Sequence, residues 1–168
     1  MLRHLLIYFQ TIITFSAIIY IMKQLLFTCT ALLAAIVLNA QTSNDTTAIK
    51  QLLEKESATW RSGDIQAHAD CWHIQPYSKI LVSTPDGKSF VVPPDMMIHP
   101  PTDIFGKGGS AANTNYTFSI HGDDAWVSHD EASTAANGSV SYSHEMKILE
   151  RINNEWKLVA ESIHVYKP

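Results

Sequence analysis

The stretch SHEMKILERINNEWKLVAESIHVY, residues 143–166, decides the fold. In each half, apolar and polar side chains tend to alternate along the chain, which is typical of a β-strand with one buried face. Asn153 and Asn154 separate the halves, at a place where asparagine suits the tight turn of a hairpin. The stretch therefore predicts a long antiparallel hairpin at the end of the chain.

Two earlier segments extend this hairpin into a sheet. TNYTFSIH (114–121) and DAWVSHDEAST (124–134) both have the composition of strands. Gly122-Asp123 stands between them, and Asn137-Gly138 follows the second, so each boundary carries residues of hairpin turns. Four consecutive antiparallel strands are therefore expected in the second half of the chain.

A shorter hairpin is expected before these strands. KILVST (79–84) and SFVV (89–92) flank the turn PDGK, in which Gly87 suits a positive φ. DMMIHPP (95–101) predicts a short irregular or helical piece, because its prolines stop a long helix. GKGGSAAN (106–113) predicts a lid or a flexible connection, and it lacks the Lys-Ser/Thr ending of a phosphate-binding loop.

Two helices are expected before the first hairpin. Asp45 or Thr46 is the candidate cap of the first helix, whose apolar residues fall largely on one face: Ile49, Leu52, Leu53, Ala58 and Trp60. Ser62-Gly63-Asp64 ends this helix, and Asp64 caps the next one, which Pro76 closes. The second helix places four residues on one face: Ile65, His68, Ala69 and Trp72. Helices followed by strands predict an α+β domain, with the helices packed on one face of a mostly antiparallel sheet.

The N-terminal part of the chain is expected to be a targeting segment. Met22-Lys23-Gln24, the apolar run LLFTCTALLAAIVL and the small-residue end NAQ predict a signal peptide at 22–40, cleaved near Ala40. Residues 1–21 are then a mis-called start or an extra apolar segment. The alternative is a membrane anchor over residues 5–38, which would attach the protein to a membrane if it stays uncleaved. In the first case the protein is exported, to the periplasm or the medium, as a single domain at 41–168.

The composition of residues 41–168 argues against a nucleic-acid partner, an internal disulfide and a metal site. This part holds ten Lys or Arg against 16 Asp or Glu, so its net charge is −6 and a nucleic-acid partner is not expected. Cys71 is the only cysteine of this part, which predicts a small buried residue and no internal disulfide. A metal site on the second helix needs a second ligand four residues after His68, but that residue is Trp72, so no metal site is expected. No cofactor is expected either.

Three pieces of the chain carry a resemblance to a known family. They are ATWRSGDIQAHADCW (58–72), DDAWVSHD (123–130) and the hairpin at 143–166. In this order they resemble the nuclear transport factor 2-like superfamily of polyketide cyclase-like and steroid isomerase-like proteins, over nearly all of residues 46–167. The resemblance implies a cone-shaped fold, in which a strongly curved sheet wraps around the helices and leaves a pocket at its wide end. It also implies charged residues inside the cone at Glu145 and Lys147 in some members, but no single reaction.

Strand alternation sorts the candidate pocket residues. The concave side of the last strand is predicted to carry Trp156, Leu158, Ala160, Ser162 and His164, and the outer side Val159, Glu161, Ile163 and Val165. In the strand before it, two assignments stay open: either Tyr142, His144, Met146 and Ile148 face inward, or Glu145, Lys147 and Leu149 do. In the central strand His129 and Glu131 point away from Asp130, so His129 and Asp130 line one pocket only if a bulge intervenes.

Three functions remain open at this point. The first is an exported protein that binds a small, partly apolar molecule in a pocket lined by Trp60, Trp72, His73, Tyr77, His129 and His164. The second is a lyase or isomerase that uses acid–base groups in the same pocket, with candidates His129, Asp130, His144 and His164 and with Tyr77 or Tyr116 polarising a carbonyl. The third is a homodimerisation module that pairs through the outer sheet face at Val159, Ile163 and Val165.

Overall fold

The computed structural model describes residues 23–24 and 44–168, and residues 45–168 form one compact unit. The predicted signal peptide at 22–40, the segment 1–21 and the alternative anchor at 5–38 lie outside the described residues, except for Lys23 and Gln24. Within the described residues, no helix is both long enough and apolar enough to cross a membrane.

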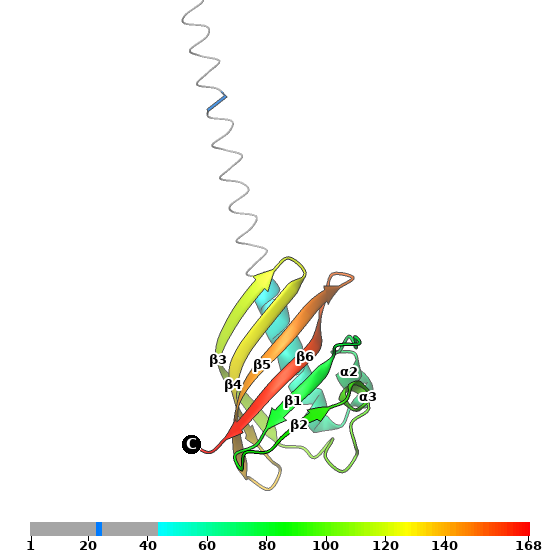
Figure 1. Ribbon diagram of the computed structural model, residues 1–168, viewed down its shortest axis with the longest axis vertical. Coiled ribbons are helices and arrows are strands. Elements are labelled where there is room, and N and C mark those ends of the chain that lie inside the picture. Colours follow the sequence, from blue (N-terminus) through cyan, green and yellow to red (C-terminus); the bar gives the residue numbers. More distant parts are fainter. Residues whose placement is uncertain (1–22, 25–43) are drawn as a thin grey trace, which may run out of the picture. The chain divides into compact units, whose positions relative to one another are not determined.

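A six-stranded sheet forms most of this unit (Figure 1). Its strands are β1 (Lys79–Ser83), β2 (Ser89–Val92), β3 (Ser110–His121), β4 (Asp124–Thr134), β5 (Val140–Ile152) and β6 (Glu155–Tyr166). Their order in the sheet is β2-β1-β6-β5-β4-β3. β1 pairs with β6 in parallel, and the other neighbours pair antiparallel. The predicted α+β class is confirmed.

The turns of the sheet lie where the sequence places them. Asn153 and Asn154 join β5 to β6 with φ values of 51° and 67°, and Gly122 and Gly138 occupy the other two long hairpin turns with φ values of 63° and 84°. Positive φ costs glycine little, and asparagine tolerates it better than most residues do. The turn residues therefore fix how the long strands pair.

Three helical segments pack beside the sheet: residues 44–62, α2 (Ile65–Ala69) and α3 (Pro94–Ile98). Asp64 caps α2 as predicted, because its carboxylate accepts a hydrogen bond from the Ala67 N–H at 3.0 Å. Residue 44 is already helical, so Asp45 does not cap the first helix. Its carboxylate instead accepts hydrogen bonds from Arg151 Nη2 at 2.7 Å and Trp156 Nε1 at 3.2 Å.

The core lies between the 44–62 helix and the inner face of the sheet (Figure 1). The helix contributes Ile49 and Leu53, which are at most 1% exposed, and the strands contribute Val127, Leu149 and Leu158, which are fully buried. Cys71 and Trp72 complete the core beside α2. Burial confirms the prediction for Cys71, and the loss of solvent raises the pKa of its thiol to about 11.

A β-bulge in β6 overturns the predicted alternation of that strand. Ile148 pairs with Ala160 but Leu149 pairs with Leu158, so Val159 is an extra residue in β6, and both Leu158 and Val159 are fully buried. Beyond the bulge the side chains exchange faces. The prediction of a concave side bearing Ala160, Ser162 and His164 is therefore wrong.

The residues predicted for the outer face of β6 are also misplaced, for the same reason. Val159 is buried in the core, and Glu161 and Ile163 line an internal cavity. In β5 the open choice is resolved, because Glu145, Lys147 and Leu149 are buried while their neighbours His144, Met146 and Ile148 are exposed.

Candidate functional site

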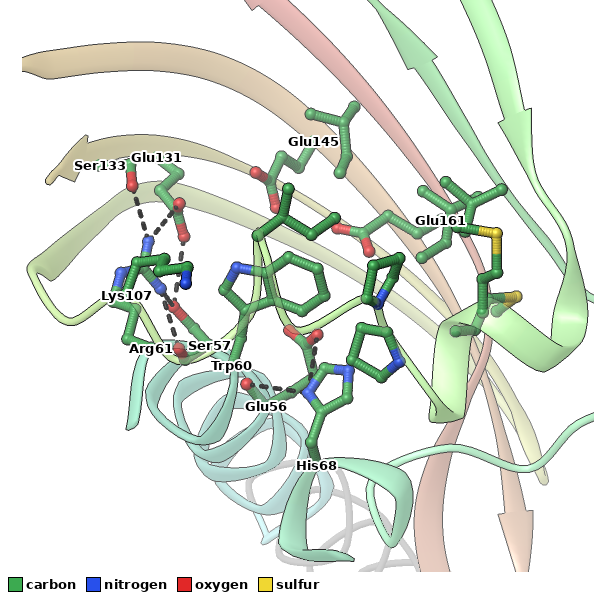
Figure 2. A pocket seen from close by; sticks show the side chains of 18 of the residues that line it. Glu56, Ser57, Trp60, Arg61, His68, Lys107, Glu131, Ser133, Glu145 and Glu161 are labelled. Carbon is green, nitrogen blue, oxygen red and sulfur yellow. Dashed lines mark hydrogen bonds and ion pairs between the residues drawn. The ribbon is translucent and has the colours of Figure 1, made fainter. Parts of the chain in front are cut away.

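A cavity of about 420 Å³ lies between the 44–62 helix and the inner face of the sheet (Figure 2). One part of its wall is apolar and comes from β2, α3 and the loop after α3. Its members Phe90, Val91, Met96 and Ile104 are 53%, 58%, 38% and 51% exposed, so they surround the opening, and we call them the apolar mouth.

The opposite part of the wall carries buried charges. We use the name charged floor for Glu56 of the 44–62 helix, Glu145 and Lys147 of β5, and Glu161 of β6. Lys147 Nζ forms a close ion pair with Glu161 and lies 3.3 Å from Glu145 Oε2 and 3.6 Å from Glu56 Oε2. Three carboxylates from three different elements thus converge on one ammonium group.

Burial and mutual attraction set the ionisation of the charged floor. Burial favours the neutral form of Lys147, but the three carboxylates outweigh it and hold its pKa well above the usual range. Burial raises the pKa of Glu161 well above its ordinary value, against the opposing effect of Lys147. Burial acts in the same direction on Glu145, but there Lys147 prevails and lowers the pKa to about 2. The charged floor therefore combines a carboxyl group of lowered pKa, Glu145, with one of raised pKa, Glu161.

Two buried histidines adjoin the charged floor. His68 lines the cavity, with its Nδ1 3.6 Å from Glu56 Oε1 and its ring centroid 5.5 Å from that of Trp60. His129 lies behind Glu145, with its Nε2 3.5 Å from Glu145 Oε2. Burial and the nearby Lys147 lower the pKa of His129, so its ring is neutral at neutral pH. Among the described residues, neither ring nitrogen of His129 has a hydrogen-bond partner.

A second charged pair lines the cavity away from the charged floor. Arg61 Nη2 lies 2.7 Å from Glu131 Oε1 and donates to Ser133 Oγ at 2.9 Å (Figure 2). Burial, together with Glu145, raises the pKa of Glu131. The guanidinium is thus already bound to protein acceptors at this end of the cavity.

The glycine-rich loop is fixed to the end of the 44–62 helix. Gly106 N–H donates to Trp60 O at 3.0 Å, and Gly108 N–H donates to Arg61 O at 2.9 Å. A Cβ on Gly106 would lie 2.9 Å from Gly63 Cα, so the two backbones approach as closely as glycine allows. The loop that the sequence predicted as a lid or a flexible connection therefore closes the helix end and places Lys107 in the cavity wall.

The structure separates the residues that the sequence grouped as a pocket. Trp60 lines the cavity, whereas Trp72 is 6% exposed and packs in the core. His73 donates its backbone N–H to Leu158 O at 2.8 Å, and Tyr77 is 54% exposed with its hydroxyl bonded to Glu150. The described residues that line the cavity do not include Trp72, His73 or Tyr77.

The candidate acid–base residues are also divided. Asp130 and His144 form an ion pair at 2.6 Å, but they and the exposed His164 lie on the outer face of the sheet. His129 points inward yet reaches the cavity only through Glu145. Asp130 and His129 therefore lie on opposite faces, and no bulge brings them together.

Sequence reasoning missed the charged floor as a unit. A signal for Glu56 exists, because it continues the apolar stripe of Ile49, Leu53 and Trp60, where a carboxylate is costly without a partner. Glu145 and Lys147 are two residues apart and hence share a face of β5. Glu161 gave no such signal, because the bulge at Val159 reverses its face.

The donor set of the described residues suits acid–base chemistry or the binding of polar groups. Three carboxyl groups and one ammonium border a cavity with an apolar opening. In residues 23–24 and 44–168, no group of three His, Cys, Asp or Glu side chains is arranged to hold a metal ion.

Comparisons with known proteins identify the fold. A proposed dehydratase of the NTF2-like family from Streptomyces avermitilis superimposes with a TM-score of 0.61 and 14% identity, over 76% of this chain and 99% of that one. An NTF2-like protein with a cystatin-like fold from Novosphingobium aromaticivorans gives 0.58 and 14%, over 77% and 87% of the two chains. An NTF2-like protein from Cytophaga hutchinsonii gives 0.56 and 16%, over 71% and 96%.

The chain therefore has the nuclear transport factor 2-like fold, as its sequence motifs implied. No protein-family model and no curated protein sequence matches it. Because the identities are this low, the similarity shows the fold alone, and an activity has to be inferred from the residues of the cavity.

Proposed function

We propose that the protein binds a small, partly apolar molecule in the cavity, with the apolar part at the mouth and a polar group at the charged floor. The observation that carries this proposal is an open cavity of about 420 Å³ that joins exposed apolar side chains to buried charged ones. Ligand sites commonly have this composition and a volume of roughly 300–1,000 Å³. The fold leaves room for such a site between its helices and its sheet.

The energetic cost of the charged floor supports a functional role. The side chains of Lys147, Glu145 and Glu161 are only 4–7% exposed, and desolvating charges costs several kcal/mol each before their attraction offsets it. Apolar residues of the same size would hold the helix against the sheet as well or better. Buried charges that border a cavity are therefore typical of residues kept for binding or catalysis.

Acid–base catalysis in the same cavity is the second candidate function. The raised pKa of Glu161 favours a proton donor and the lowered pKa of Glu145 favours a proton acceptor, and the two carboxyl groups lie in the same charged floor. A lyase or isomerase reaction needs such a pair. In this proposal Glu145 and Glu161 take the roles for which the sequence offered His129, Asp130, His144 and His164.

A test of binding uses two adjacent residues of β6 that face opposite ways. Ile163 lines the cavity and Ser162 lies on the outer face, so Ile163→Trp fills the cavity while Ser162→Trp leaves it open. The uncharged dye Nile red should fluoresce with the wild-type protein and with Ser162→Trp, and should lose its signal with Ile163→Trp. Equal signals from both variants would contradict binding in the cavity.

Two further proposals concern location and assembly. We propose that the chain is exported and cleaved near Ala40, which mass spectrometry of the exported protein tests.

We also propose a homodimer through the outer sheet face, where Trp126, Met146 and Ile148 are 40%, 47% and 46% exposed. In the described sheet Trp126 pairs with Ile148, and Met146 lies two residues before Ile148 on the same face of β5, so the three residues form one patch.

A further inference from the structure

We infer that the charged floor receives a cationic group, an ammonium, carried by the molecule that occupies the cavity. This inference rests on the proposed small-molecule function and names the chemical class of its ligand. It follows from the balance of charges and hydrogen-bonding groups in the charged floor, and from a buried imidazole that this balance leaves without a partner.

Acceptors outnumber donors in the charged floor. Lys147 Nζ donates a hydrogen bond to Glu161 and lies 3.3 Å from Glu145 Oε2 and 3.6 Å from Glu56 Oε2, so one ammonium faces the six oxygens of three carboxyl groups. Ser143 adds one donor, from its hydroxyl to Glu145 Oε1 at 2.8 Å. Glu56, Glu145 and Glu161 all line the cavity, where a ligand with several N–H donors can bond to their carboxyl groups.

The charges are also unbalanced. Three carboxyl groups share one ammonium in the charged floor. The Arg61 guanidinium is taken up by Glu131, and the exposed Lys107 lines the cavity but has no ion pair with the charged floor among the described residues. A second positive charge on the cavity side is therefore the group that the charged floor lacks.

His129 supplies an independent sign that the cluster is incomplete. His129 is 3% exposed and directs Nε2 toward Glu145 Oε2 across 3.5 Å, which exceeds a good hydrogen bond. Within the part of the chain that the structure describes, both nitrogens lack hydrogen-bond partners, which is costly for a buried group. A cation that draws the carboxyl groups of the charged floor together would let His129 Nε2 form a hydrogen bond with Glu145 Oε2.

The ionisation of Glu161 is linked to the binding of a cation. Burial raises the pKa of Glu161 well above its ordinary value, against the opposing effect of Lys147. The groups that face it are Glu145 and Lys147 on β5 and Glu56 on the 44–62 helix, with His68 beyond Glu56 and His129 beyond Glu145. An ammonium beside Glu161 favours its ionised form, so binding should lower the pKa of Glu161 and release protons.

The test compares three probes that share one apolar body. Naphthylmethylamine, naphthylmethanol and naphthylacetate carry a cationic, a neutral and an anionic group at neutral pH. Isothermal titration of the intact protein should show the amine binding about tenfold to a hundredfold more tightly than the alcohol, as charge-assisted hydrogen bonds allow, with the carboxylate weakest. Titrations in buffers of different ionisation enthalpy should show proton release with the amine alone.

Two variants locate the effect. Glu161→Gln should reduce the affinity for the amine about tenfold, remove the proton release and leave the alcohol unchanged. Glu155→Gln, on the exposed part of the same strand, should change none of these values. Should Glu161→Gln fail to fold, Glu56→Gln serves in its place, because Glu56 also lines the cavity.

The outcomes separate this inference from the proposed function. An alcohol or carboxylate that binds as tightly as the amine overturns the inference and leaves small-molecule binding intact. Failure of all three probes, together with a Nile red signal that Ile163→Trp does not remove, overturns the proposed function itself.

Discussion

Lys147 and Glu161 stand directly opposite each other on the paired strands β5 and β6, and their side chains form an ion pair that is only 5% and 4% exposed. The pairing depends on the bulge at Val159, which turns Glu161 inward. With Glu56 and Glu145 these residues make the charged floor. The cavity, its electrostatics and its proposed ligand all follow from this contact.

Removal of the Lys147 ammonium group should destabilise the protein strongly. Lys147→Met leaves three buried carboxylates without their shared partner, so we expect a loss of about 3–5 kcal/mol in the free energy of unfolding at pH 7. Lys157→Met, on the neighbouring strand, removes a pair with the exposed Glu155 and an exposed hydrogen bond to Asp70 O, and should cost about 1 kcal/mol. Urea denaturation measures both. Similar losses in the two variants would contradict a larger contribution of the buried Lys147 to stability.

The ionisation of Glu161 should be visible in the pH dependence of stability. Its pKa is higher in the folded state than in the unfolded state, so the stability that it contributes is fully present below about pH 4.5 and declines as the pH rises through the folded pKa. Gln does not titrate. Glu161→Gln should therefore gain stability relative to the wild type as the pH rises from 5 to 8, by at most about 1.4 kcal/mol per pH unit. A constant difference would mean that Glu161 is ionised throughout.

The loop before β3 should not accept a side chain at Gly109. A Cβ there would lie 2.2 Å from Thr134 O, and φ is +93°. Gly87 has a similar φ of +83° but no atom within 4 Å of the added Cβ. Gly87→Ala should cost about 1–2 kcal/mol through backbone strain alone, and Gly109→Ala clearly more, because backbone must also move. Thermal denaturation of the two variants compares them; equal losses would contradict the close approach of β3 and β4.

Dimerisation through the outer face should be sensitive to charge. Met146 is 47% exposed and pairs with Ser128 and Ser162 in the middle of this face. Met146→Glu should shift the protein from dimer to monomer in analytical ultracentrifugation, because the interface would bury two like charges. Lys88→Glu, on the β1–β2 turn, should leave the dimer unchanged. A wild-type protein that sediments as a monomer at high concentration would refute the dimer.

The sequence was sufficient for the elements and the fold class, because local chemistry determines them. Asn153 and Asn154 mark their turn by tolerance of positive φ, and Asp64 marks the start of α2 by its capping carboxylate. The end of α2 was less well predicted. Trp72 continues the apolar spacing of a helix, but it leaves the helix and forms a β-bridge with Leu158. Tertiary contact overrides helical periodicity there.

The site was predictable only in part, because it depends on strand register. The bulge at Val159 places two consecutive apolar residues, Leu158 and Val159, in the core, and a sequence cannot show which residue of such a run is the extra one. Every residue after it is then assigned to the wrong face. The strand register does not affect Trp60, because this residue lies on the 44–62 helix, where the apolar stripe sets the direction of its side chain.

The indole signals of the protein test the central claim most directly. Trp60 lines the cavity, whereas Trp126 lies on the outer face of the sheet, so the two side chains report on different surfaces. In nuclear magnetic resonance spectra of the ¹⁵N-labelled protein, naphthylmethylamine should shift the indole N–H signal of Trp60 in a saturable manner and leave that of Trp126 in place. A saturable shift of Trp126 with Trp60 unmoved would contradict a ligand site in the cavity.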